Sequence, residues 1–262
     1  MGSKPAKPSR GRAPLPESYR KRTYRERVHT TGLVAFRVVC EQTDLLIQAE
    51  RPLADEAREH VLDCRGQIAG YIRRYPEFAT TLVPWPNVSP APLVVRQMIH
   101  AGQAAGVGPM AAVAGAIAES VGRGLLEATS RIVVENGGDL FVKSDAPLVA
   151  GIFAGASPLS MKMGLKIPDT GDGLGLCTSS GTVGHSLSRG VADAVCVVAR
   201  SSALADAAAT AIGNRIQRPG DIDGAIQSGR GMGDILGIVV VVGRQMGAWG
   251  SIELVPLNRK KG

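Results

Sequence analysis

The order of the apolar segments constrains the fold of this chain more than any other feature. A strand-like pair and three helical stretches come first, and six short strand-like segments are then crowded into residues 131–199. These segments are Arg131–Glu135, Leu140–Lys143, Leu148–Ala154, Lys162–Ile167, Leu174–Thr178 and Ala192–Ala199. Strands that follow one another without a helix after each one favour an α+β fold with largely antiparallel sheets packed with helices, because parallel neighbours need long crossover connections.

The segments on either side of this region complete the expected fold. Before it we expect a hairpin formed by Leu33–Cys40 and Asp44–Ala49. Three helices should follow, over Leu53–Arg74, about Leu93–Ala105 and about 109–128. After it we expect a helix over 202–217, a short helical turn near 221–228, a strand over Ile235–Gly243 and a final strand near 249–256. Pro76 closes the first helix and Pro109 opens the third, because proline is tolerated only in the first turn of a helix.

The positive charge of the chain lies at its ends. Residues 1–27 hold nine Lys or Arg against two Glu, a net of +7, which equals the formal net charge of the whole chain. This segment is also proline-rich and lacks apolar periodicity, so we expect a disordered basic arm. Residues 259–262 form a short basic tail. Residues 28–258 are expected to form one domain, with a subdivision left open at the proline-rich segment 84–92.

Composition and charge placement disfavour several classes of function. Nucleic-acid binding is not expected, because the basic residues gather in the arms and aromatic residues make up 4% of the chain. The longest apolar run, Ile235–Val242, is too short to span a bilayer, and no apolar stretch of a secretory signal follows the N-terminal basic residues. We therefore expect a cytoplasmic protein without a membrane partner.

The segment Ser202–Gly213 places two oxygen-bearing side chains in a run of small residues. Ser202 is a candidate N-cap, and the alanines that follow favour a helix. A spacing of four puts Asp206 and Thr210 on one helix face, one turn apart, where small neighbours leave room for an ion and a ligand. The alternative is a solvent-facing Asp favoured by the helix dipole, with the Thr hydroxyl bonded to a backbone carbonyl.

Three further segments have compositions that allow a ligand to approach. The stretch Ala111–Ala118 consists of small residues, although close packing against another element explains them equally well. Glu135–Asp139 turns through two glycines, which suits either a type I′ hairpin turn or an anion-binding turn. Cys177–Ser186 runs into hydroxyls, glycines and His185, whose N–H and O–H groups can donate to phosphate oxygens.

In their order along the chain, these segments resemble the ApbE-like superfamily, whose best-known members are magnesium-dependent FAD:protein FMN transferases. The resemblance covers roughly residues 110–215 and rests on four motifs. These are GAIA at 115–118, NGGD at 136–139, T-S-x-G at 178–181 with His185, and ADAAAT at 205–210. The last is the most specific, because it is similar letter for letter to the family's A-D-A-x-A-T.

The resemblance implies a ligand site assembled from these motifs. Asp206 and Thr210 would hold Mg²⁺, together with a main-chain carbonyl from the helix at 115–118 and phosphate or water oxygens. The implied flavin- or nucleotide-contacting residues are Gly115, Ala116, Ala118, Asn136, Gly137, Gly138, Asp139, Thr178, Ser179 and Gly181. His185 would be an acid/base or a substrate contact. The implied small-molecule ligand is FAD or a related flavin nucleotide, and a homodimer is left open.

Two departures from the family pattern bear on the activity. The family helix reads G-x-I-A-K-G-Y, whereas this chain has Glu119 at the lysine position and Arg123 one turn later. The D-P-x-T-G segment that the family has after His185 is missing. We therefore expect a compact branch of the superfamily, an Mg-dependent enzyme acting on a phosphate-bearing small molecule such as a flavin nucleotide. The alternative is a non-catalytic binding protein that retains the pocket.

Overall fold

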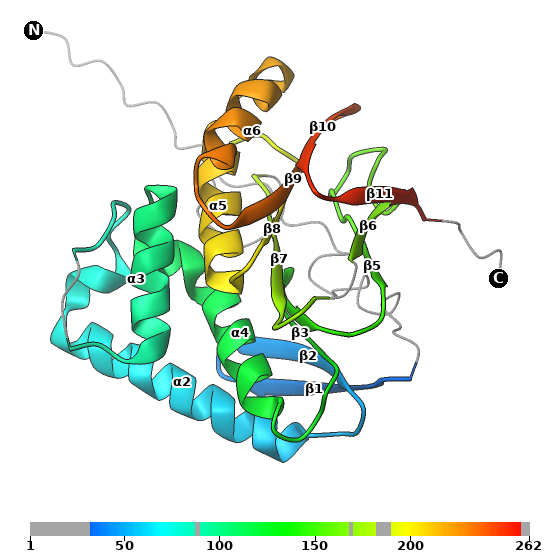
Figure 1. Ribbon diagram of the computed structural model, residues 1–262. Coiled ribbons are helices and arrows are strands. Elements are labelled where there is room, and N and C mark those ends of the chain that lie inside the picture. Colours follow the sequence, from blue (N-terminus) through cyan, green and yellow to red (C-terminus); the bar gives the residue numbers. More distant parts are fainter. Residues whose placement is uncertain (1–31, 87–89, 168–169, 182–189, 258–262) are drawn as a thin grey trace, which may run out of the picture.

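The computed structural model describes residues 32–86, 90–167, 170–181 and 190–257. Within these ranges the chain forms five α-helices and eleven strands, and the strands make two antiparallel sheets (Figure 1). The expected α+β class is therefore confirmed. The basic arm at 1–27, the tail at 259–262 and His185 lie outside the described residues, and the subdivision near 84–92 stays a prediction.

An eight-stranded sheet forms the centre of the fold. Its strands, in spatial order, are β1 (Val34–Cys40), β2 (Thr43–Ala49), β3 (Ile132–Asn136), β4 (Asp139–Lys143), β7 (Leu174–Ser179), β8 (Ala194–Ala199), β9 (Ile235–Val242) and β10 (Gln245–Gly250). The expected hairpin at the start of the chain is the β1–β2 pair, with Val34 opposite Ala49. Consecutive side chains alternate between the two faces of this sheet, so β7, β8 and β9 each contribute to an apolar cluster on either face.

A three-stranded sheet covers part of one face of the large sheet. Its strands, in spatial order, are β11 (Glu253–Pro256), β6 (Met163–Ile167) and β5 (Leu148–Gly151). Leu165 and Ile167 of β6 share an apolar cluster with Leu176 of β7 and Val239 of β9. This contact holds the two sheets together over part of their surface.

The helices cover the opposite face of the large sheet (Figure 1). They are α2 (Ala54–Arg74), α3 (Leu93–Ala105), α4 (Val113–Leu125), α5 (Ser202–Asn214) and α6 (Ile222–Arg230), with short 3₁₀ turns η2 (Pro76–Ala79), η3 (Pro109–Ala112) and η4 (Pro219–Asp221). Leu45 and Ile47 of β2 are fully buried beneath them. Among the described residues no single helix could cross a membrane by length and apolar content; only α3 and the η3–α4 segment together meet that criterion, as a pair bent by 106°.

Two expected elements differ from the structure near chain reversals. The single final strand expected near 249–256 is wrong: β10 ends at Gly250 and β11 begins at Glu253, and the two strands belong to different sheets. Gly250 has φ +108°, a conformation that lets the chain leave one sheet for the other. The helix expected from Pro109 starts as the 3₁₀ turn η3 and continues as α4 only to Leu125.

Helix α5 is packed closely between α4 and β7. A Cβ atom added to Gly115 of α4 would lie 2.2 Å from the Ser202 carbonyl oxygen, and one added to Gly175 of β7 would lie 2.3 Å from the Ser202 Cα. Ala116 and Ala118 of α4 are fully buried. The small residues of α4 therefore serve close packing, which was one of the two explanations left open for them.

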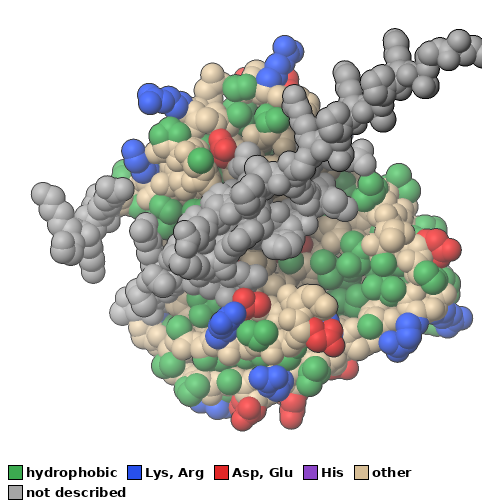
Figure 2. Space-filling view, turned by 180° about the vertical axis from the view of Figure 1, so that it is seen from behind, with side chains coloured by type: hydrophobic (Ala, Val, Ile, Leu, Met, Phe, Trp, Pro, Cys, Tyr) green, Lys and Arg blue, Asp and Glu red, His purple; other side chains and the backbone are tan. Residues whose placement is uncertain are grey.

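Charged side chains of both signs are mixed on one face of the molecule. On the face shown in Figure 2, Lys and Arg lie singly among Asp and Glu and do not gather into a patch. Several of the described basic residues pair locally with acids, as Arg37 does with Asp44 and Lys166 with Glu253, each at 2.8 Å. On this face the distribution gives no indication of a nucleic-acid-binding surface.

Candidate functional site

A cavity of about 1110 Å³ opens where the two sheets diverge beside α5. Its volume is slightly above the range usual for small-molecule sites, so it can take a ligand of dinucleotide size. The wall is built by strands of both sheets, by η3 and by α5. The site therefore depends on the whole fold and not on one local motif.

One part of the cavity is apolar. On the large sheet, the residues that face away from the helices line it: Leu46 of β2, Val133 of β3, Val142 of β4 and Leu176 of β7. The small sheet and the chain that follows β5 add Leu148, Ile152, Phe153, Leu165 and Ile167. Two apolar surfaces facing each other across a gap are suited to a flat hydrophobic ring.

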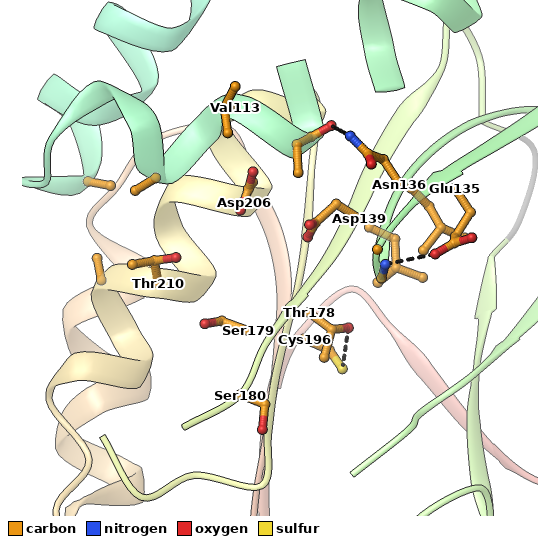
Figure 3. A pocket seen from close by; sticks show the side chains of 18 of the residues that line it. Val113, Glu135, Asn136, Asp139, Thr178, Ser179, Ser180, Cys196, Asp206 and Thr210 are labelled. Atoms are coloured by element: carbon orange, nitrogen blue, oxygen red, sulfur yellow. Dashed lines mark hydrogen bonds between the residues drawn. The ribbon is translucent and has the colours of Figure 1, made fainter. Parts of the chain in front are cut away.

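The other part carries two carboxylates. Asp206 of α5 and Asp139 at the start of β4 are both half-buried in the cavity wall, and their side chains point toward the same space (Figure 3). Asp206 Oδ2 accepts a hydrogen bond of 2.9 Å from the Gly115 N–H. Thr210 lies one turn further along α5 and lines the same cavity. The interpretation of Asp206 as a solvent-facing residue of a helix start therefore does not hold.

The environment of these carboxylates disfavours their charged forms. Loss of hydration raises the pKa of Asp206 to about 7. Hydrogen bonds from the backbone of Gly115 and Ala114 lower this pKa, but they do not outweigh the loss of hydration. The pKa of Asp139 is also raised well above its usual range, first by loss of hydration and then by the charge of Asp206. No described basic side chain contributes to either shift. A pair of this kind is relieved by a bound cation.

The donor set around the two carboxylates fits magnesium. Within the described ranges, no group of three or more His, Cys, Asp or Glu side chains forms a cage made of protein ligands alone. Two carboxylates and the Thr210 hydroxyl would leave positions for ligand and water oxygens, which is how Mg²⁺ is usually held. Calcium sites generally need more protein oxygens.

Hydroxyl groups at the end of β7 continue the polar wall. Thr178 Oγ1 lies 3.2 Å from Cys196 Sγ, and both residues line the cavity. Ser179 is 6% exposed, and its Oγ has no hydrogen-bond partner among the described residues. In Figure 3 this hydroxyl points toward α5. A buried hydroxyl without a partner is costly, so its position in the wall suggests that a ligand satisfies it.

The NGGD motif forms a hairpin turn whose two ends are fastened to the protein. Gly137 and Gly138, with φ of +70° and +111°, connect β3 to β4, and Asn136 pairs with Asp139. The Gly138 N–H donates to Glu135 Oε1 at 2.9 Å, so the chain itself uses a donor that an anion would need. Asn136 Nδ2 donates to the Ala114 carbonyl at 3.1 Å (Figure 3). The turn therefore lines the cavity mainly as a support for Asp139.

Four other residues expected to contact the ligand lie behind the wall. Gly115, Ala116 and Ala118 do not line the cavity, although the Gly115 N–H holds Asp206. Gly181 donates its N–H to the Ala192 carbonyl at 2.9 Å, and a Cβ there would lie 1.8 Å from the Gly190 oxygen. The small size of these residues is explained by neighbouring backbone segments that pack closely against them. His185 lies outside the described residues.

Glu119, which stands at the family's lysine position, does not line the cavity. Its carboxylate accepts hydrogen bonds from Ser201 Oγ at 2.9 Å, the Ser202 N–H at 2.7 Å and Arg123 Nε at 2.8 Å. It therefore satisfies, from a neighbouring helix, a buried backbone N–H at the start of α5 that has no partner within that helix. The expectation that Ser202 is the N-cap is wrong, because the helix already begins at Ser202, whose hydroxyl donates to the Leu140 carbonyl.

Several lining residues were not expected from the sequence. Asn214 follows Thr210 by four positions, as Thr210 follows Asp206, so all three lie on one face of α5, and all three line the cavity. Extending the same spacing by one turn would have found it. Arg215 also lines the cavity, as do the segments 80–82 and 105–108, which carry no motif.

Comparison with known proteins shows one consistent relationship. The family model described as "AbpE bacteria" matches residues 25–233. A UPF0280 protein of Methanococcus aeolicus is 43% identical over 211 residues, covering 78% of this chain and 85% of that protein. A UPF0280 protein of Methanothrix thermoacetophila is 41% identical over 207 residues, covering 78% of this chain and 86% of that one.

Solved structures share the fold at low sequence identity. The flavin transferase ApbE from Vibrio cholerae superposes with a TM-score of 0.55 at 10% identity, covering 84% of this chain and 97% of that chain. The apo form of the flavinyl transferase ApbE from Pseudomonas stutzeri gives 0.53 at 15% identity, covering 83% and 94%. The resemblance to ApbE-like proteins is therefore confirmed in family and fold.

Proposed function

Because this chain belongs to the family described as "AbpE bacteria", we propose that it binds a flavin nucleotide together with Mg²⁺ and acts on the phosphate linkage of that ligand. FAD is the first candidate. The names of the structural neighbours, flavin transferases of the same fold, suggest the ligand class. The cavity supplies the physical argument, because it combines an apolar gap with an oxygen-rich polar end.

The observation that carries the proposal is the pairing of Asp139 and Asp206. Both carboxylates lie in the wall of the same cavity, and each lacks a described basic partner among the causes of its pKa shift. Such a pair gains most from a divalent cation. A cation held there would in turn attract the phosphate groups of a nucleotide.

Each part of the wall has a distinct role in this proposal. Asp139, Asp206 and Thr210 hold the cation, and the apolar gap between the sheets takes the flavin ring. The Ser179 hydroxyl, which points toward α5, donates a hydrogen bond to a phosphate group. When bound, Mg²⁺ would neutralise the pyrophosphate and stabilise charge that develops on a leaving phosphate.

The first test is flavin binding at equilibrium. The purified protein is titrated with FAD, followed by flavin fluorescence, once with MgCl₂ and once with EDTA. We expect Mg²⁺ to strengthen FAD binding by the wild type by at least about tenfold in affinity. Asp206→Asn should bind FAD with the same affinity in MgCl₂ and in EDTA. Asp223→Asn, an exposed acid in the first turn of α6, is the matched control. Absence of FAD binding in Mg²⁺, or an unchanged Mg²⁺ effect in Asp206→Asn, contradicts the proposal.

A second test separates an enzyme from a binding protein. FAD is incubated with the protein and Mg²⁺, and the small molecules are separated after denaturation. Release of FMN or AMP, or flavin that remains bound covalently to protein, supports catalysis. Quantitative recovery of FAD supports the alternative of a pocket that binds without reaction.

A further inference from the structure

The charges that line the cavity are unbalanced for the ligand proposed above. Among the described residues of the wall, Glu135, Asp139 and Asp206 are acidic, and Arg215 is the one basic residue. A magnesium ion offsets the two aspartates but leaves little positive charge for a nucleotide with more than one anionic group. The position of Arg215 therefore matters for what the cavity can hold.

Arg215 lies at the end of α5 away from Asp206. It follows Asp206 by nine residues, which is roughly 13 Å along a helix axis, and it is the C-cap of α5. Its side chain is exposed and forms no ion pair or side-chain hydrogen bond within the described part of the chain. Arginine is well suited to phosphate and carboxylate groups because its planar guanidinium can donate two parallel hydrogen bonds.

Close backbone packing brings the end of β7 to this end of α5. Gly190 lies against the end of the helix, because a Cβ there would be 1.9 Å from the Gly213 carbonyl oxygen. Gly181, two residues after Ser179, is packed equally closely against the Gly190 carbonyl. The Val191 N–H donates to the Ile216 carbonyl at 2.9 Å, which fixes this arrangement.

Three polar side chains therefore line one end of the cavity. They are the buried Ser179 hydroxyl without a described partner, the Asn214 amide and the Arg215 guanidinium. We propose that Ser179, Asn214 and Arg215 form an anion subsite, separate from the carboxylate pair, that binds a phosphate or carboxylate group of the ligand. This inference rests on the proposed function for the identity of the ligand, but not for the presence of the subsite.

The test uses small anions first, so that it does not depend on flavin binding. Inorganic pyrophosphate and glutarate are titrated into the full-length protein by calorimetry in EDTA, which leaves out any contribution of Mg²⁺. We expect the wild type to bind at least one of them and Arg215→Ala to weaken that binding by about tenfold or more. Pyrophosphate binding indicates a phosphate subsite, and glutarate binding indicates a carboxylate subsite. Arg73→Ala, an exposed arginine in the last turn of α2, is the matched control.

A second measurement tests the same subsite with flavins. In EDTA, the wild type should prefer FMN over riboflavin, and Arg215→Ala should lose that preference while its affinity for riboflavin stays unchanged. A subsite is ruled out if neither anion binds the wild type, or if Arg215→Ala matches the wild type in both experiments. Failure of all flavins to bind, with anion binding that depends on Arg215, would contradict the proposed function and leave the subsite standing.

Discussion

Two carboxylates lie close together in the cavity wall, and the protein alone does not compensate for the unfavourable free energy of ionising both of them. Asp139 and Asp206 each have a raised pKa, and Asp139 feels the charge of Asp206 directly. Functional sites often show such shifts, because a carboxylate whose ionised form is unfavourable in the empty protein is stabilised when a cation binds. At the scale of single residues, this pair distinguishes a ligand site from an ordinary helix surface.

The raised pKa of Asp206 predicts how stability depends on pH. The folded state holds this proton up to about pH 7, whereas an unfolded Asp releases it near pH 4. The free energy of unfolding without metal should therefore fall as pH rises from about 4 to 7. Stabilisation by MgCl₂ should instead grow as pH rises through about 7, because the cation needs the ionised carboxylate.

Urea unfolding at pH 5, 6, 7 and 8, with MgCl₂ and with EDTA, measures both effects. Asp206→Asn should show a flatter dependence on pH and little response to MgCl₂. A wild-type protein whose response to MgCl₂ does not change with pH would contradict this explanation.

Substitution of Glu119 should lower the stability of the protein without removing a ligand contact. Glu119→Ala leaves the Ser202 N–H and the Ser201 hydroxyl without their acceptor at the start of α5. We expect it to lower the free energy of unfolding by about 1–3 kcal/mol. Glu119→Gln retains an acceptor oxygen and should cost less. Equal stability of wild type and Glu119→Ala in chemical denaturation would show that this capping contact is unimportant.

At the scale of elements, the position of α5 determines the site. The helix carries Asp206, Thr210, Asn214 and, at its C-cap, Arg215, and glycines let it lie directly against α4 and β7. Two hydrogen bonds join the helices: the Gly115 N–H donates to Asp206, and the Ser202 N–H donates to Glu119. The two bonds are one helical turn apart on both α4 and α5. They fix both the depth and the rotation of α5.

Two glycine substitutions test this packing. Gly115→Ala places a Cβ within 2.2 Å of the Ser202 oxygen, so we expect a loss of about 1–3 kcal/mol in the free energy of unfolding. Gly66→Ala in α2 is the control, because a Cβ there meets nothing within 4 Å. It should leave the protein equally stable or stabilise it by up to about 1 kcal/mol. Thermal or urea unfolding of both variants makes the comparison, and a harmless Gly115→Ala would contradict it.

Local sequence predicted much of this arrangement, but not its long-range contacts. Periodicity located α3 at its observed bounds, and spacing placed Asp206 and Thr210 on one face of α5. The pairing of Asp206 with Asp139 depends on how α5 packs against the sheet, which no local pattern contains. The capping of α5 by Glu119 joins residues 83 positions apart, so no local pattern contains it either.

At the scale of the whole molecule, the cavity exists because the second sheet covers only part of the first. Side chains of both sheets line its apolar part, and α5 lines the polar part. A ligand that fills this space contacts elements from β2 to α5, so its binding should stabilise the complete fold. The unfolded chain offers no equivalent site.

FAD with Mg²⁺ should therefore raise the melting temperature. At a ligand concentration about 100 times its Kd, mass action adds about 2.7 kcal/mol, or roughly 5–10 °C for a chain of this size. Neither FAD with EDTA nor MgCl₂ alone should give the full shift. Differential scanning fluorimetry measures it, with Asp206→Asn expected to show little of the Mg²⁺-dependent part. A full shift from FAD in EDTA would show that the carboxylates hold no cation.

In the proposed function, Asp139 and Asp206 together hold a divalent cation beside a flavin nucleotide. A crystal structure with FAD and Mn²⁺, which replaces Mg²⁺ and scatters anomalously, would locate that cation. We predict an anomalous peak within bonding distance of both carboxylates and the Thr210 hydroxyl, with the flavin ring in the apolar gap between the sheets. A cavity with FAD bound but no anomalous peak at Asp139 and Asp206, or Mn²⁺ bound elsewhere, would contradict the account.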